Sequence, residues 1–250
     1  MVFTDIKNST ALWESHAIAM RASIKIHNGI MRKLLRFYRG YEVKTEGDAF
    51  MASFQSPLSA LQWTLAVQIE LLKEDWPTEI LCSPDGAEIA WISSTEGKPS
   101  STTDSDKILL WRGLCVRMGI HYGTPLCEVD STTLRMDYFG PMVNRAARIC
   151  GASQGGQILI SSDMLKEVKR RLNGLGDWSE VKDGQDIFQN TPTSTFDRRP
   201  SSDQQAQDMD DVNRLKKLGM NLWLIGEMKL KGLETPEILF AVSIIYKNYF

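Results

Sequence analysis

The spacing of apolar residues predicts an alternation of helices and short strands from the start of the chain. Residues 1–6 are expected to end a buried strand, and a helix follows the capping residues Asn8, Ser9 and Thr10. Apolar side chains recur at three- and four-residue spacing along this helix, which Gly40 is expected to end.

A hairpin and a second helix are expected next. Residues 41–45 and 48–54 flank Glu46-Gly47, a pair suited to a tight turn between two strands. Pro57, with Ser56 as its cap, can open a helix whose leucines share one face. Because strands and helices mix and hairpins occur, the pattern favours an α+β layer fold whose sheet contains antiparallel strands. The later expected elements are strands at 114–121 and 157–160, helices at 141–150 and from 161 or 162 to about 172, and a last hairpin at 222–231 and 238–245.

Two polar segments interrupt this pattern, at about residues 83–108 and 173–210. Both are rich in Ser, Thr and Asp, and neither separates two complete apolar cores. We therefore expect residues 1–250 to form one domain that carries two inserted loops.

The composition narrows the possible functions. Hydrophobic residues make up 42% of the chain, which allows a sizeable core, and a net charge of −2 gives no field that would attract nucleic acid. The four cysteines are scattered, which argues against a zinc site and a disulfide framework and favours a reducing, cytoplasmic location. No apolar run approaches the roughly 20 residues of a membrane-spanning helix, so we expect no transmembrane segment.

Two carboxylates and a lysine stand out within apolar strands. Asp5 and Asp48 each lie where a buried charge costs free energy unless a cation compensates it. Brought together by neighbouring strands, they would suit hard divalent cations, although a helix cap and a turn residue explain them equally well. Lys44 could donate a hydrogen bond to a ligand or form a simple ion pair.

Further polar residues follow in the second half of the chain. Asn144 and Arg148 are four residues apart on the expected helix and share one face, which suits contacts with a hydroxyl and a phosphoryl oxygen, or with solvent alone. Arg117 lies in an apolar strand. Lys229 and Lys231 alternate on the last hairpin, where they could also simply form a solvated edge.

Six motifs follow one another along nearly the whole chain. They are Phe-Thr-Asp-Ile, Lys-Thr-Glu-Gly-Asp-Ala-Phe, Arg-Met-Gly-Ile-His-Tyr-Gly, Asp-Tyr-Phe-Gly-Pro-Met-Val-Asn-Arg-Ala-Ala-Arg, Gly-Gly-Gln-Ile-Leu-Ile-Ser and Lys-Leu-Lys-Gly-Leu-Glu-Thr-Pro-Glu. In this order they resemble class III nucleotidyl cyclases, and they are most similar to the catalytic domain of fungal adenylate cyclases. The resemblance implies a ferredoxin-like βαββαβ core with a mixed or antiparallel sheet and helices packed on it.

The resemblance implies roles for the charged residues near the phosphates of a nucleotide. Asp5, Asp48 and the backbone carbonyl of Ile6 match the ligands of two Mg²⁺ ions per site, for which Mn²⁺ can substitute. Arg117 and Lys229 match the cations that bind the triphosphate. Lys231 receives no role.

The remaining matches concern the base and the ribose. Lys44 and Asp137 match the pair that reads adenine, and Asn144 and Arg148 match the pair that acts on the ribose and the transition state. A lysine donor beside an aspartate acceptor complements adenine better than guanine. The resemblance therefore implies conversion of ATP to cyclic AMP and pyrophosphate, in sites shared by the two protomers of a head-to-tail homodimer.

Two alternatives remain open at this point. A guanylyl cyclase would share the fold but take GTP, and a non-catalytic cyclase-like module would bind nucleotide or dimerise without turnover. The first strand begins at Met1, so upstream regulatory domains are expected to be missing and could place the domain at the cytoplasmic face of a membrane.

Overall fold

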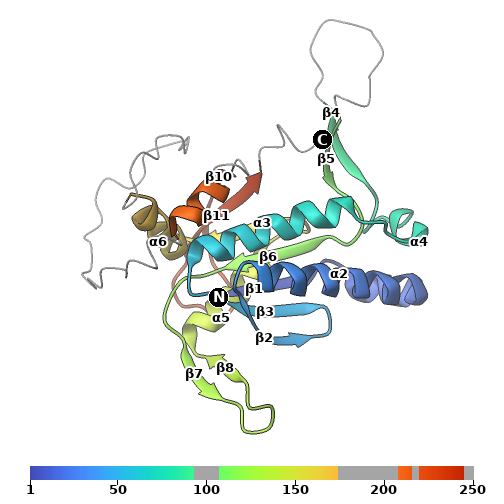
Figure 1. The fold of residues 1–250 in the computed structure, drawn as a ribbon. Helices are drawn as coiled ribbons and strands as arrows, with labels where there is room; N and C mark the ends of the chain where they lie inside the picture. Colours follow the sequence, from blue (N-terminus) through green and yellow to red (C-terminus); the bar gives the residue numbers. More distant parts are fainter. Residues whose placement is uncertain (93–106, 174–207, 216–219, 245–250) are drawn as a thin grey trace, which may run out of the picture.

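The structure is a computed structural model that describes residues 1–92, 107–173, 208–215 and 220–244. Its helices and strands follow in the order that the apolar pattern predicts, with two additional hairpins, the short helix α4 and a helical segment at 208–215 (Figure 1). The elements are β1 (Val2–Ile6), α1 (Ser9–Ser15), α2 (Ala17–Phe37), β2 (Tyr41–Glu46), β3 (Ala49–Ser53), α3 (Pro57–Lys73), α4 (Thr78–Leu81), β4 (Ile89–Ile92), β5 (Lys107–Trp111), β6 (Val116–Ile120), β7 (Leu126–Val129), β8 (Met136–Phe139), α5 (Pro141–Ala152), β9 (Ile158–Ser161), α6 (Ser162–Asn173), β10 (Met220–Met228) and β11 (Glu237–Ile244).

One seven-stranded sheet organises the domain, with strand order β10-β11-β9-β6-β1-β3-β2. The β6–β9 pair is parallel, and the other neighbouring strands of this sheet are antiparallel. The units β1-α2-β2 and β3-α3-β6 place four strands in the order β6-β1-β3-β2, which is a ferredoxin-like βαββαβ arrangement. The predicted fold class is confirmed.

Helices cover both faces of this sheet. α2 and α3 lie side by side across one face (Figure 1), and their apolar residues form the main core with Val2, Ile6 and Phe50. On the other face, Val143 and Ala146 of α5 pack in a smaller cluster with Met51. Because side chains alternate along a strand, Asp5 of β1 lies on the α5 face.

A glycine lets α5 approach the sheet closely. A Cβ atom at Gly119 of β6 would overlap the backbone of Cys150, which belongs to α5. A close approach of two backbones is a recurring reason for glycine in a strand. The candidate residues on α5 are thereby held against the strand that carries Arg117.

The first long helix is interrupted where one continuous helix was expected. α1 ends at Ser15 and α2 begins at Ala17, because His16 has φ −139° and ψ 49° and leaves the helical conformation.

His27 of α2 is fully buried, and this burial lowers its pKa to about 4. Its Nδ1 lies 3.0 Å from Asn28 Oδ1.

The predicted turn between β2 and β3 and the predicted start of α3 are confirmed. Gly47 has φ +64°, a backbone conformation that glycine adopts readily, and β2 pairs with β3 around it. The Ser56 hydroxyl accepts a hydrogen bond from the backbone N–H of Ser59, and Pro57 occupies the first turn of α3.

The predicted inserts are loops only in part. β4 lies within the first segment and pairs with β5, because its short run of β-branched and aromatic residues finds a partner strand some 15 residues later in the chain. Residues 208–215, which overlap the end of the second segment, are helical, and Asp211 there accepts a hydrogen bond from the Ser59 hydroxyl. Residues 83–88 of the first predicted loop contain no helix or strand, and residues 93–106 and 174–207 lie outside the described residues.

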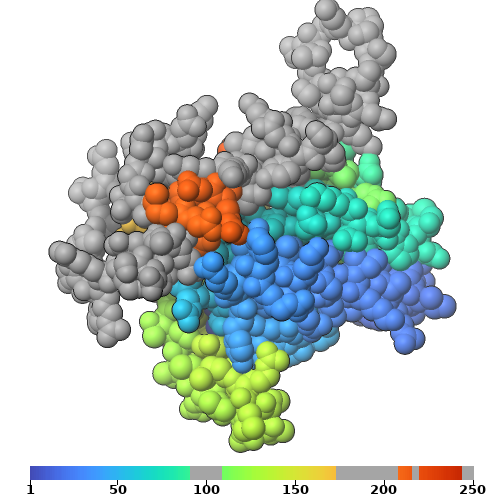
Figure 2. Space-filling model, viewed as in Figure 1, coloured from blue at the N-terminus to red at the C-terminus, as the bar shows by residue number. Residues whose placement is uncertain are grey.

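β7 and β8 form a hairpin that the apolar pattern did not predict. Its tip is closed by Asp130, whose side chain accepts hydrogen bonds from the backbone of Thr132 and Thr133. Figure 2 shows this hairpin, in yellow-green, as a lobe that stands out from the body of the domain. We call residues 126–139 the arm.

The last hairpin was expected at residues 222–231 and 238–245. Its first strand, β10, begins and ends earlier, and position 245 lies outside the described residues. Among the helices that the structure describes, none is long and apolar enough to cross a membrane.

Candidate active site

The two carboxylates singled out in the sequence lie at the same end of neighbouring strands. Asp5 is in β1, and Asp48 lies in the β2–β3 turn, directly before β3. The Asp48 Oδ2 atom accepts a hydrogen bond of 3.2 Å from the backbone N–H of Ile6, the residue after Asp5. This bond holds the Asp48 carboxylate beside the end of β1, so the structure brings together the three residues predicted to bind metal.

Arg117 lies directly opposite Asp5 in the β1–β6 ladder. Its guanidinium donates two hydrogen bonds to Asp5 Oδ2, one of them 2.9 Å long from Nε. Both side chains are about 30% exposed. In the described chain, the predicted phosphate-binding arginine therefore neutralises one of the predicted metal ligands.

The donor set at this point fits a hard divalent cation. Both Arg117 bonds end on Oδ2 of Asp5, and the Ile6 N–H ends on Oδ2 of Asp48. In the described ranges, no hydrogen bond to either Oδ1 atom is found, so one oxygen of each carboxylate is free to bind. The described residues contain no group of three or more His, Cys, Asp and Glu side chains that could hold a metal ion by themselves. Two carboxylates plus substrate oxygens and water are the usual surroundings of Mg²⁺ in nucleotide sites.

A second group of candidate residues lies between β2 and the arm. Lys44 Nζ donates a hydrogen bond of 2.8 Å to Asp137 Oδ2 of β8. The Asp137 Oδ1 atom accepts the backbone N–H of Tyr138 at 2.8 Å. Lys44 Nζ also lies 5.7 Å from the centre of the Phe139 ring, within range of a cation–π interaction. The pair predicted to read a base is thus formed within one chain.

A cavity of about 310 Å³ adjoins this pair on the α5 face of the sheet. Its wall combines apolar and aromatic side chains with the polar groups of Lys44, Glu46 and Asn144. Such a cavity, mostly apolar with few polar groups, is typical of a site for a small molecule. The lining residues are Phe3, Lys44, Glu46, Ala49, Phe50, Met51, Tyr138, Phe139, Gly140, Val143, Asn144 and Ala147.

The other predicted residues lie apart from these two groups. Asn144 reaches the cavity, but Arg148, one turn later on α5, is exposed. Lys229 is exposed just after β10, and so is Lys231. Over the described ranges, no hydrogen bond or ion pair joins Arg148 or Lys229 to any other candidate residue. A single chain therefore does not assemble all the predicted residues around one point.

Some residues of the site were not found from the sequence. Phe3 and Phe139 line the cavity, and Tyr41 and Arg135 contact the residues around the Lys44–Asp137 pair. Phe3 has a recoverable signal, since it lies two residues before Asp5 and shares its face of β1. The contacts of Arg135 depend on the unpredicted arm.

Comparison with known proteins assigns the chain to a family. The profile of the adenylate and guanylate cyclase catalytic domain matches residues 1–188. The adenylate cyclase of Mycosarcoma maydis is 48% identical over 97% of this chain, and that of Schizosaccharomyces pombe is 44% identical over 98%. The chain spans only 9% and 12% of those two proteins.

Solved structures support the same fold. A Trypanosoma brucei adenylate cyclase, described in its monomeric state, superposes with a TM-score of 0.65 at 24% identity and covers all of this chain and 89% of its own. The adenylyl cyclase CyaB of Pseudomonas aeruginosa gives a TM-score of 0.56 at 20% identity, covering all of this chain and 95% of its own. The chain is a member of the class III nucleotide cyclase catalytic domain family.

Proposed function

We propose that this domain is an adenylyl cyclase that converts ATP to 3′,5′-cyclic AMP and pyrophosphate. The observation that carries the proposal is the Lys44–Asp137 pair beside a cavity of the size and character of a base site. Relatives that are 44–48% identical over most of the chain are named adenylate cyclases, which supports the same substrate.

The pair provides the hydrogen-bonding pattern that adenine requires. Adenine presents an exocyclic amine that donates and a ring nitrogen that accepts. The Asp137 carboxylate can accept from the amine, and the Lys44 ammonium can donate to the ring nitrogen. Guanine presents an acceptor and a donor in the reverse order, so this pair disfavours GTP.

The reaction exchanges one phosphorus–oxygen bond for another and releases one proton. The 3′-oxygen of the ribose bonds to the α-phosphorus, the bond from that phosphorus to the pyrophosphate oxygen breaks, and the 3′-hydroxyl proton passes to water. When bound at Asp5, Asp48 and the Ile6 carbonyl, divalent cations would lower the pKa of that hydroxyl and stabilise the phosphoryl charge.

The cationic side chains of the domain have separate tasks in this proposal. Arg148 neutralises charge that grows on the α-phosphoryl oxygens, while Asn144 orients the ribose. Arg117 can exchange its contact with Asp5 for the triphosphate once metal compensates that carboxylate. Lys229 binds the departing pyrophosphate together with Arg117.

We further propose that two copies of the domain complete each site. Asn144 and Arg148 form no hydrogen bond or ion pair with Asp5 or Asp48 in the described chain, and a second copy arranged head to tail could bring the two groups together. A homodimer would then hold two equivalent sites. The isolated monomer is expected to be inactive.

Incubation of the purified domain with Mn²⁺ and either ATP or GTP tests this function. We expect cyclic AMP from ATP and far less cyclic GMP from GTP, with all product lost when EDTA removes the metal. Chromatography of the products decides the outcome. Cyclic GMP as the main product would indicate a guanylyl cyclase, and no product at concentrations where the domain is dimeric would indicate a non-catalytic module.

A further inference from the structure

The residues that read the base belong to two different sheets. Lys44 is in β2, at the edge of the seven-stranded sheet, whereas Asp137 is in β8 of the separate two-stranded arm. No backbone ladder joins β8 to β2 within the described residues. The distance between Lys44 and Asp137 is therefore set by side-chain contacts that dock the arm on the body.

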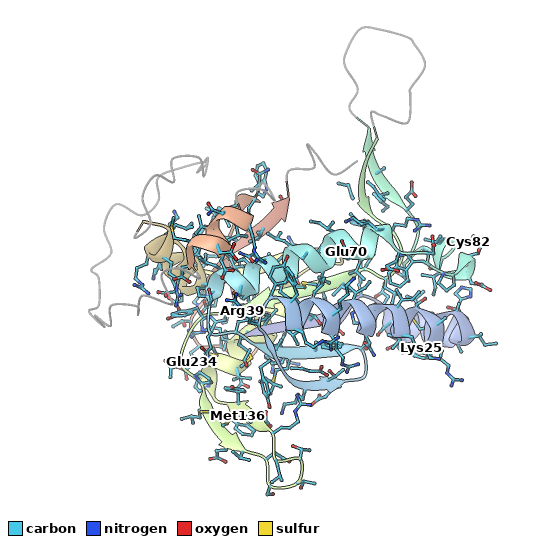
Figure 3. The ribbon with its side chains drawn as sticks, viewed as in Figure 1. Lys25, Arg39, Glu70, Cys82, Met136 and Glu234 are labelled. Carbon is cyan, nitrogen blue, oxygen red and sulfur yellow. The ribbon has the colours of Figure 1, made fainter. Side chains whose placement is uncertain are left out.

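Two such contacts lie next to the pair. The hydroxyl of Tyr41 in β2 accepts a hydrogen bond of 3.1 Å from the backbone N–H of Met136, the residue before Asp137. The guanidinium of Arg135 donates to the backbone carbonyl of Glu42 and lies 5.4 Å from the centre of the Tyr41 ring. Figure 3 labels Met136 on the arm.

Glu42, which accepts the hydrogen bond from Arg135, is itself held in place by hydrogen bonds within the body of the domain. The Glu42 carboxylate accepts two hydrogen bonds from Arg32 of α2, at 2.8 and 2.9 Å, and one of 2.8 Å from the Thr45 hydroxyl. The bonds from Arg32 are the main reason that the Glu42 pKa is lowered. The β2–β3 ladder also shifts register between Glu42 and Lys44, which indicates a β-bulge. The Glu42 carbonyl that accepts the hydrogen bond from Arg135 therefore lies at the start of the bulge that leads to Lys44.

We propose that Tyr41 and Arg135 form a clamp that positions Asp137 against Lys44 and so sets the preference for adenine. Neither residue lines the cavity. Both act through their partners Met136 and Glu42, which lie next to Asp137 and close to Lys44 in the chain. The proposal rests on the proposed function, because it concerns the substrate preference of that site. The residues that line the cavity do not by themselves reveal this positioning role of Tyr41 and Arg135.

The variants Tyr41→Phe and Arg135→Met test the clamp in the full domain. Tyr41→Phe removes the hydroxyl and keeps the ring. Loss of one hydrogen bond, about 1 kcal/mol, corresponds to a roughly fivefold change. We expect the KM for ATP to rise about fivefold in each variant and further in the double variant, with kcat changed by less than about twofold. The ratio of ATP to GTP affinity, measured by competition with a fluorescent nucleotide, should fall.

Hydrogen exchange of the Met136 amide gives a readout that does not depend on turnover. It should accelerate in Tyr41→Phe, because its acceptor is gone. Arg170→Met, which removes an ion pair with Glu167 on α6, serves as the control and should change neither affinity nor this exchange rate.

Three results would overturn the clamp. The first is unchanged exchange at Met136, which would mean that these contacts do not hold the arm. The second is faster exchange with unchanged nucleotide preference, which would mean that the docking of the arm does not govern base reading. The third is an equal loss of ATP and GTP affinity together with a lower melting temperature, which would indicate a purely structural role. A wild-type domain without turnover would count against the proposed function alone, since binding and exchange still test the clamp.

Discussion

Replacement of Asp48 by asparagine is expected to lower the rate of cyclic AMP formation by about 10²–10³-fold. A cation site at these carboxylates would supply several kcal/mol of transition-state stabilisation, and each 1.4 kcal/mol is about a factor of ten in rate. Asparagine keeps the shape of the side chain and can still accept the Ile6 N–H at its amide oxygen. The effect should therefore fall on metal-dependent turnover and leave the fold intact.

Turnover as a function of Mn²⁺ concentration, together with the melting temperature, measures this effect. Asp75→Asn, an exposed carboxylate beyond the end of α3, is the matched control and should match the wild type in both. If Asp48→Asn kept more than about a tenth of the wild-type rate, a role for Asp48 in metal catalysis would be untenable.

Arg148→Ala is expected to reduce kcat by about 10²–10³-fold with little change in the KM for ATP. The side chain is exposed on α5 and forms no hydrogen bond or ion pair with the described part of the chain, so its removal should cost little stability. Removal of a donor aimed at charge in the transition state costs about 3–4 kcal/mol in comparable enzymes. An interaction made only in the transition state lowers kcat and leaves substrate binding unchanged.

Steady-state kinetics at saturating ATP and Mn²⁺ test this expectation. Arg21→Ala, which removes an exposed arginine of α2, should leave kcat unchanged. A variant Arg148→Ala in which only KM rises would show that Arg148 binds the substrate before reaction and does not act on the transition state.

The fold was largely predictable because local signals agreed with the tertiary arrangement. The cap at Ser56, the turn at Gly47 and the apolar spacing of α2 each have a physical meaning that survives in the structure. The arm escaped prediction because Leu126, Val129 and other apolar side chains on it are exposed. An exposed hairpin need not show the alternation of apolar and polar residues that marks a half-buried strand.

The site was predictable as a set of residues but not as a set of distances. Motif positions singled out Asp5 and Arg117 separately, yet only the β1–β6 register shows that they pair with each other. The contact between Lys44 and Asp137 joins residues 93 positions apart in two sheets, which no local pattern encodes. The exposure of Arg148 likewise appears only once α5 is docked on the sheet.

Central to the proposed function, each site takes its metal ligands from one protomer and Asn144 and Arg148, which act on the ribose and the transition state, from the other. Asp48→Asn and Asn144→Ala proteins should each be nearly inactive. After random assembly of an equal mixture, half of the dimers would carry one intact site, so about a quarter of the wild-type rate should return. A mixture that stays at the average of the two separate variants, with dimers demonstrated by sedimentation, would contradict the shared site.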